Sequence, residues 1–216
     1  MSRKKSSKGL TVFIVIVVLA LIVAGGYFIW KGMNEEPEIV YDGQPPSQSE
    51  IDDMDPQPTS GRIVAPEVGL DAPLGEISIP ASNVINPPDF EHVFIFRDFG
   101  TVDDAESGTV YAATHSLKGS NSPGNDLIDI DTGQPTLGTD DEITVDGQKY
   151  EVIESHTTSK TELPADEDIW NAEIDNRLVL ITCLQRPAGR SIDNVVTIAV
   201  KDGEKLEEPD GEDEGR

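Results

Sequence analysis

The chain has few of the residues that build metal sites and disulfides. Its 216 residues include one cysteine, Cys183, and three histidines, His92, His115 and His156. An intrachain disulfide needs two thiols, and a structural zinc site needs about four Cys or His ligands at short spacing. The acidic stretch 126–142 lacks the spacing of an EF-hand calcium loop. We therefore predict no metal and no cofactor.

Positive charge is also scarce. The chain has 16 Lys and Arg against 41 Asp and Glu, a net charge of -25. Proteins that bind nucleic acid need basic patches for the phosphates, so no nucleic-acid partner is expected. The acids gather in residues 35–55 and 202–216. We predict an acidic, proline-rich extracellular stalk over 31–60 and an acidic disordered tail over 204–216.

One long apolar run is present near the N-terminus. Residues 10–30 carry no charge, and as a helix they would cover roughly the 30 Å of a bilayer core. Residues 1–9 are basic and acids follow the run, which predicts a cytoplasmic N-terminus, a transmembrane helix and an extracellular remainder. The alternative is a cleaved signal peptide, but the run exceeds the usual h-region of about 7–15 residues and no clear A-x-A site follows.

The remaining residues, 61–203, have the size of one domain and are rich in strand signals. Many short strands separated by Gly and Pro favour a mainly-β closed barrel or a sandwich. Residues 177–183 are uniformly apolar apart from Arg177 and Thr182 and should lie in the middle of the sheet. The expected strands are 108–115, 142–157 with an Asp146-Gly147 hairpin turn, 177–183, 194–200 and, more weakly, 72–80 and 92–96; short turns of helix are expected within 122–130 and 167–173.

Cys183 stands at the end of the apolar strand, in the stretch LVLITCLQRPAGR of residues 178–190. A cysteine nucleophile needs a nearby base or cation and a donor for the oxyanion of acyl transfer. His115 ends another strand and Arg190 precedes the next one, so the three side chains could converge at one barrel rim. A free cysteine is also among the most commonly buried residue types, and packing alone would equally explain it.

Several motifs resemble the sortase family, in particular actinobacterial sortases often grouped as class F. Leu180-Ile181-Thr182-Cys183 resembles the L-x-T-C nucleophile signature, and Asp193-Asn194-Val195-Val196 resembles the start of the family's last strand. The resemblance covers residues 66–200. Its other segments, in family order, are PEVGLDAPLGEISIP, VYAATHS, SPGNDLIDI and ITVDGQKYEV.

The resemblance implies an eight-stranded β-barrel and a membrane-anchored cysteine transpeptidase of a Gram-positive cell surface. Such an enzyme cleaves an LPxTG-type sorting signal between Thr and Gly through a thioester. It then joins the surface protein to an amine of a peptidoglycan precursor or a pilin lysine. Residue matching makes Cys183 the nucleophile and His115 the general acid, with Thr182 lining the substrate groove.

The sequence departs from the family at two places. Thr114 precedes the histidine where sortases commonly have Gly, and Ile192 stands where many relatives have the catalytic arginine. Arg190 lies two residues earlier, which on a strand keeps the same face, so we predict Arg190 rather than Arg186 as the catalytic arginine.

Two other functions remain open from the sequence. One is a non-catalytic barrel domain that binds a cell-surface partner. The other is a papain-like cysteine hydrolase, although that class uses a helix-borne cysteine and an Asn or Asp that orients its histidine.

Overall fold

The computed structural model describes residues 25–26, 46–82, 84–104 and 107–204. The chain separates into two compact units, Met1–Glu38 and Ile39–Arg216, and the strands that the structure describes belong to the second. The predicted basic N-terminus, nearly all of the predicted membrane helix, half of the stalk and almost all of the tail lie outside the described residues. Among the residues that are described, no helix is long and apolar enough to cross a membrane.

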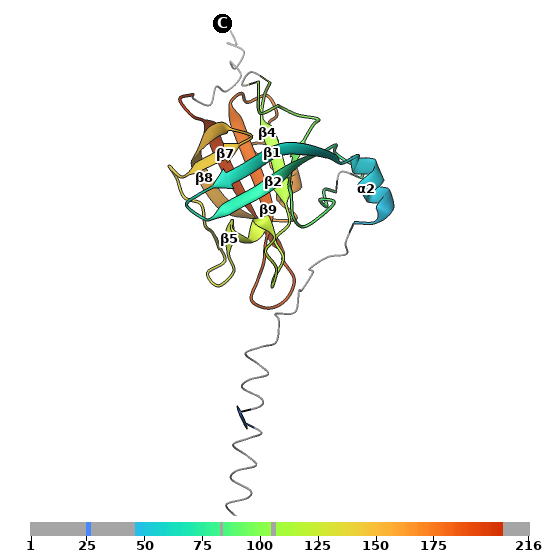
Figure 1. The fold of residues 1–216 in the computed structure, drawn as a ribbon, viewed down its shortest axis with the longest axis vertical. Coiled ribbons are helices and arrows are strands. Elements are labelled where there is room, and N and C mark those ends of the chain that lie inside the picture. Colours follow the sequence, from blue (N-terminus) through green and yellow to red (C-terminus); the bar gives the residue numbers. More distant parts are fainter. Residues whose placement is uncertain (1–24, 27–45, 83, 105–106, 205–216) are drawn as a thin grey trace, which may run out of the picture. The chain divides into compact units, whose positions relative to one another are not determined.

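Eight strands form a closed barrel in the order β1-β2-β3-β4-β9-β10-β8-β7 (Figure 1). This confirms the mainly-β closed barrel. A separate two-stranded sheet consists of β5 and β6. The elements are α2 (Gln48–Met54), β1 (Gln57–Ala65), β2 (Leu70–Ile77), β3 (Val93–Phe96), β4 (Val110–Thr114), the 3-10 helix η1 (Pro123–Asn125), β5 (Ile128–Asp129), β6 (Gln134–Pro135), β7 (Glu142–Val145), β8 (Gln148–Ser159), the 3-10 helix η2 (Leu163–Ala165), β9 (Arg177–Leu184) and β10 (Asp193–Lys201).

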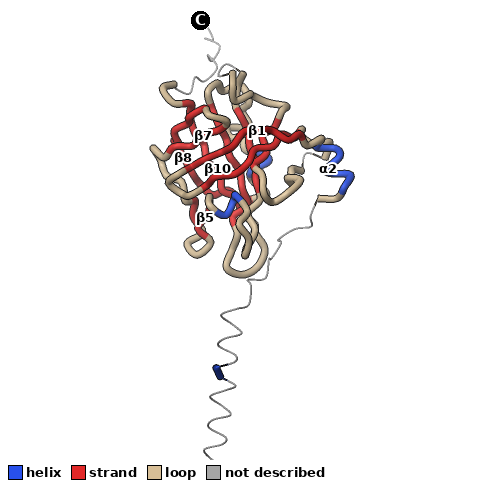
Figure 2. Tube along the Cα trace, in the orientation of Figure 1, coloured by secondary structure: helices blue, strands red, loops and turns tan. Residues whose placement is uncertain are grey.

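Most neighbouring strands in the barrel are antiparallel, and two pairs are parallel. β2 pairs in parallel with β3, and β4 pairs in parallel with β9. Parallel neighbours need a crossover connection rather than a tight turn. Residues 78–92 join β2 to β3, and a longer stretch that contains β5 to β8 joins β4 to β9. Figure 2 draws the loops of the chain in tan.

The hairpin of β7 and β8 forms where the sequence predicts it. Asp146 has φ of 46° and Gly147 has φ of 83°, the positive angles of a tight type I′ turn. Val145 and Gln148 face each other across this turn. The turn chemistry thus fixes the register of the hairpin.

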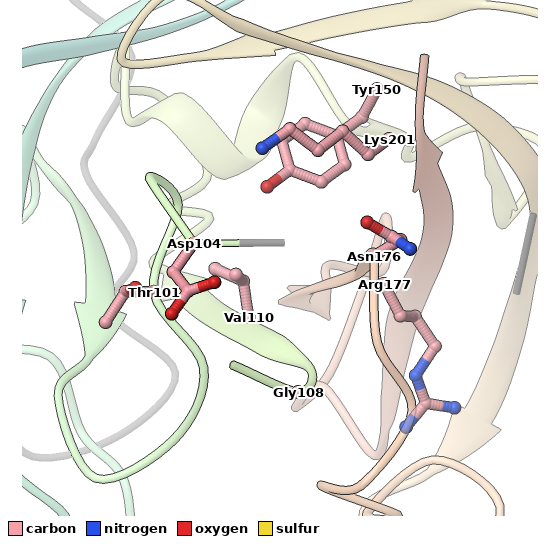
Figure 3. A pocket seen from close by; sticks show the side chains of 8 residues that line it. All are labelled: Thr101, Asp104, Gly108, Val110, Tyr150, Asn176, Arg177 and Lys201. Carbon is pink, nitrogen blue, oxygen red and sulfur yellow. The ribbon is translucent and has the colours of Figure 1, made fainter. Parts of the chain in front are cut away.

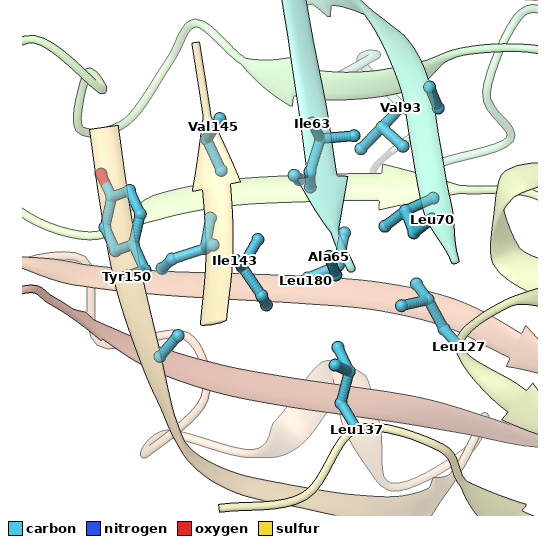
Figure 4. Close-up of a cluster of buried hydrophobic side chains, with 14 of the residues drawn as sticks. Ile63, Ala65, Leu70, Val93, Leu127, Leu137, Ile143, Val145, Tyr150 and Leu180 are labelled. Atoms are coloured by element: carbon cyan, nitrogen blue, oxygen red, sulfur yellow. The ribbon is translucent and has the colours of Figure 1, made fainter. Parts of the chain in front are cut away.

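The apolar residues form two clusters on the two sides of the barrel wall. The interior cluster fills the barrel with side chains such as Ile63, Leu70 and Leu180 (Figure 4). The second, the outer cluster, lies on the outer face of the wall and includes Phe96 and Val179. Because both faces are covered, β9 is buried along nearly its whole length, as its uniformly apolar sequence predicts.

The folded part begins earlier than residue 61, inside the stretch predicted as stalk. Ser47 and Glu50 form a reciprocal capping box at the start of α2, and Met54 at the other end of this helix is 1% exposed. Met54 and Ile51 pack on the outer cluster. This stretch therefore contains a short amphipathic helix despite its acidic composition. The acidic residues of the helix lie on its exposed side.

Candidate active site

Two strands far apart in the sequence end side by side at one rim of the barrel. In the parallel pair of β4 and β9, Ala113 lies beside Ile181 and Thr114 lies beside Thr182. The next residue on the first segment is His115 and the next on the second is Cys183. The pairing places these two predicted residues in neighbouring positions.

His115 and Cys183 also lie on the same face of the barrel sheet. Side chains alternate between the two faces of a strand. Ala113 and Ile181 belong to the outer cluster, so the residues two positions further along each segment continue on that outer face. Cys183 remains partly accessible there.

Thr182 points to the other face, into the barrel, and is only 2% exposed. Its Oγ1 donates a hydrogen bond of 3.1 Å to the carbonyl oxygen of Thr114. The structure thus gives Thr182 the role of fastening β9 to β4, whereas the resemblance implies a residue that lines the groove. The reason is the two-residue period of a strand: a residue next to Cys183 cannot share its face.

The imidazole of His115 is buried, with 7% of the residue exposed. Its Nε2 lies 2.9 Å from the carbonyl oxygen of Pro87, and the Phe90 ring lies 4.7 Å away between centroids. Because a carbonyl only accepts, Nε2 carries the proton, and proton exchange with a reactant falls to Nδ1. The connection between β2 and β3 therefore sets the orientation of this ring.

Burial lowers the pKa of His115 below its ordinary value of 6.5, because an imidazolium is costly to desolvate. The Pro87 hydrogen bond and the charge of Asp89 act in the opposite direction, and the charge of Lys160 lowers the pKa further. His115 is thus predominantly neutral at neutral pH. A neutral imidazole beside a thiol can accept the thiol proton as the sulfur attacks.

The backbone at His115 is held by the segment around η1. Its carbonyl oxygen accepts hydrogen bonds from Ser122 Oγ at 2.7 Å and from the Gly124 amide at 2.9 Å. A Cβ on Gly124 would lie 2.6 Å from that same oxygen, so only glycine allows this approach. The predicted turn at 122–130 therefore serves to fix the histidine.

A second set of hydrogen bonds joins the ends of β4 and β9. Ser116 Oγ donates to the carbonyl oxygen of Cys183, and Gln185 Nε2 donates to the carbonyl oxygen of Ser116 at 3.0 Å. Both side chains are buried, at 4% and 6% exposed. Sequence reasoning missed this bridge, although Ser116 directly follows the histidine and Gln185 comes two residues after the cysteine.

Both candidate arginines lie in the connection between β9 and β10. β10 begins only at Asp193, so Arg190 is not on a strand, and the reasoning that it keeps the face of residue 192 does not apply. Arg186 and Arg190 are both exposed. The residue that faces Cys183 across β10 is Asn194, which is 7% exposed. The choice of Arg190 over Arg186 stays a prediction.

The connection between β8 and β9 covers the other end of the outer face. Trp170 stacks on Tyr111 with ring centroids 5.1 Å apart, and its Nε1 donates to the carbonyl oxygen of Leu163 at 2.8 Å. Tyr111 in turn donates its hydroxyl to the carbonyl oxygen of Ile169 at 2.8 Å. These contacts hold residues 163–171 of this connection against Tyr111 on the outer face of the barrel, and we call this segment the wall.

Arg177 lies under the wall and binds its backbone, and the residue is only 4% exposed. Its guanidinium donates to the carbonyl oxygens of Asp168 at 2.8 Å and Ile169 at 3.1 Å, to the carbonyl oxygen of Asn171, and to Thr109 Oγ1 at 3.0 Å. Backbone carbonyl oxygens and the hydroxyls of Thr109 and Tyr111, rather than a carboxylate, thus bind this buried cation. Sequence reasoning placed Arg177 only at the start of a strand and missed this role.

A small pocket near Arg177 is distinct from the candidate site (Figure 3). It lies at the start of β9, whereas Cys183 lies near the end of that strand, about 20 Å away at the usual rise of a strand. Its lining residues are Thr101, Asp104, Gly108, Val110, Tyr150, Asn176, Arg177 and Lys201. In this view the guanidinium of Arg177 turns away from Tyr150 and Lys201.

The other two histidines lie beside acids. His92 Nδ1 is 2.9 Å from Asp89, and His156 Nδ1 is 3.0 Å from Glu154. Within the described ranges, no group of three or more His, Cys, Asp or Glu side chains is arranged to hold a metal ion.

Comparison with known proteins gives structural neighbours only. No family model and no curated protein matches the chain. Sortase A from Listeria monocytogenes matches with 17% identity and a TM-score of 0.47, over 68% of this chain and 88% of that one. Sortase C-1 from Actinomyces oris has 18% identity and a TM-score of 0.47, over 67% and 74% of the two chains. A Clostridium perfringens sortase D5 transpeptidase has 21% identity and a TM-score of 0.43, over 66% and 78%.

Proposed function

We propose that this chain is a membrane-anchored cysteine transpeptidase of the sortase type. The observation that carries the proposal is the placement of His115 and Cys183 in neighbouring positions, on one face and at one rim of the barrel. The L-x-T-C motif around Cys183 and the order of the surrounding segments support the same activity. The class F, actinobacterial subtype is part of this proposal and rests on the sequence resemblance alone.

The geometry at the rim suits acyl transfer in two steps. In the first, the Cys183 thiol gives its proton to Nδ1 of His115 while the sulfur attacks the carbonyl carbon of the scissile peptide bond. The imidazolium then protonates the leaving amine, the C–N bond breaks, and a thioester on Cys183 remains. In the second step an incoming amine attacks the thioester, loses its proton to His115, and the thiolate leaves.

The oxyanion that forms in each step needs a donor. We assign this role to Arg190, whose loop leads from β9 directly into the strand beside it. Asn194, which faces Cys183 across the sheet, borders the same space.

The substrate and the location belong to the same proposal. The sorting signal is of the LPxTG type, cut between Thr and Gly, and the acceptor is an amine of a peptidoglycan precursor or a pilin lysine. Residues 10–30 anchor the chain in the cell membrane with the N-terminus in the cytoplasm and the barrel outside. Alkaline extraction of membranes tests the anchor: the full chain should stay in the membrane pellet, and release into the supernatant would contradict it.

A peptide assay tests the activity. A peptide containing an LPxTG-type motif is incubated with the protein, with and without an amine acceptor, and the products are identified by mass. An amide-exchanged product that disappears in Cys183→Ala and His115→Gln supports the proposal. Hydrolysis that an amine cannot divert indicates a protease, and no turnover with any sorting motif indicates a non-catalytic barrel.

A further inference from the structure

Lys160 lies on the same face of the barrel wall as Cys183. It follows β8 directly, and its amide donates a hydrogen bond of 2.9 Å to the carbonyl oxygen of Ile192. This extends the ladder in which Thr158 faces Asn194, and Asn194 faces Cys183 on its other side. Residues that face each other in an antiparallel pair point to the same side, so the side chains of all three strands share the outer face.

The register sets the distance that the lysine must span. β8 and β9 flank β10, so their backbones are about 10 Å apart, and Lys160 lies two residues, about 7 Å, further along than Thr158. A lysine side chain extends about 6 Å from its Cα. Leaning across Ile192 and Asn194, it brings the ammonium close to the space in front of Cys183.

Two observations indicate that the side chain does lean inward. The backbone of Lys160 is three strands away from His115, yet its charge acts on the imidazole and opposes protonation. Coulomb interactions fall off with distance and with exposure to water, so this effect agrees with an ammonium that leans over the sheet toward His115. Lys160 is also only partly exposed, as expected for a stem that packs on the outer face.

The other described cations near this rim are placed differently. Lys118 donates to the carbonyl oxygen of Pro187, and Arg186 and Arg190 are exposed in the connecting loop. Lys160 forms no ion pair and no side-chain hydrogen bond with any residue that the structure describes. An ammonium that is partly desolvated and has no carboxylate partner is stabilised when an anion forms nearby.

We propose that Lys160 is a further cation of the catalytic centre, whose ammonium stabilises the Cys183 thiolate and the oxyanion of the tetrahedral intermediate. The oxyanion part rests on the proposed function, while the thiolate part does not depend on any substrate. The other titratable or charged groups on the segments that meet at this rim are His115, which follows β4, Asp89 from the connection before β3, Asp193 at the start of β10, and the two loop arginines.

The thiolate part is tested by the rate at which iodoacetamide alkylates Cys183 as a function of pH. Lys160→Met keeps the length of the side chain and removes the charge, and Lys160→Arg restores a charge. At neutral pH we expect the methionine variant to be alkylated about three- to tenfold more slowly than wild type, and the arginine variant to stay near wild type. Lys149→Met is the matched control, because Lys149 lies on β8, the strand that Lys160 follows, but pairs with Glu142 at 2.7 Å.

The oxyanion part is tested with the sorting peptide and the amine acceptor. Lys160→Met should lower kcat about tenfold with little change in KM, and Lys160→Arg should recover most of it. A methionine variant with the alkylation profile and the kcat of wild type overturns the proposal. If Lys160→Met slows alkylation of Cys183 but wild type turns over no peptide, the transpeptidase proposal fails while the role of Lys160 toward the thiolate stands.

Discussion

Replacing Arg177 with methionine should both destabilise the barrel and loosen the wall beside the candidate site. The guanidinium is 4% exposed and donates to three loop carbonyl oxygens, of Asp168, Ile169 and Asn171. Methionine fills much of the same volume but satisfies none of them. The carbonyl oxygen of Ile169 keeps the Tyr111 hydroxyl and that of Asn171 keeps the Thr109 hydroxyl, so it is the Asp168 carbonyl that loses its donor. A buried polar group left without a partner costs about 1–3 kcal/mol, so we expect the free energy of unfolding to fall by about 1–3 kcal/mol. Arg177→Lys keeps the charge with fewer donors and should lose about half as much.

Urea denaturation measures the stability, and the peptide assay on the folded Arg177→Lys variant measures the wall. On the proposed function its KM should rise more than its kcat falls, because the wall lies beside the candidate site and away from the reacting atoms. Arg62→Met is the matched control, since Arg62 forms an ion pair with Asp71 in which both side chains are more than half exposed. Such a pair contributes about 0–1 kcal/mol. If Arg177→Met and Arg62→Met lose the same stability, the account of the wall is refuted.

Three further predictions concern the rim itself. Gly124→Ala should lower the free energy of unfolding by about 1–3 kcal/mol and slow turnover, because the new Cβ lies 2.6 Å from the His115 carbonyl oxygen. Gly138→Ala is the control in the urea denaturation and should be neutral, because no backbone atom lies within 4 Å of its new Cβ. Burial lowers the pKa of His115, so as the pH falls below 6.5 the unfolded chain takes up a proton before the folded chain does. The free energy of unfolding of wild type should therefore fall more steeply in this range than that of His115→Gln. Parallel plots of this free energy against pH between pH 7 and 5 would contradict the prediction. Arg190→Ala should lower kcat by about a hundredfold while Arg186→Ala keeps nearly full activity, and the reverse result would reassign the oxyanion donor.

The parts of this structure that the sequence predicts are those decided by local rules. The Asp146-Gly147 turn forms as predicted because its two positive φ angles require those residue types. β9 is central because it has no polar face to turn toward water. The alternation of side chains along a strand is an equally local rule. Applied to the residue before Cys183, it places Thr182 inside the barrel.

The parts that could not be predicted depend on long-range pairing. That His115 and Cys183 meet follows from the parallel register of β4 and β9, which spacing along the chain does not determine. The position of Arg190 was argued from a strand that starts only at Asp193. Lys160 approaches the rim through β8 and β10, and no motif in the sequence marks it.

The central claim, that Cys183 is a nucleophile activated at this rim, is tested most directly by trapping the acyl-enzyme. The protein is mixed with a sorting-motif peptide in the absence of any amine acceptor, quenched in acid and measured by intact mass. We expect an adduct equal in mass to the acyl part of the peptide, located on Cys183, absent in Cys183→Ala and lost on addition of an amine. An unmodified protein whose thiol still reacts with iodoacetamide, across a panel of sorting motifs, would contradict it.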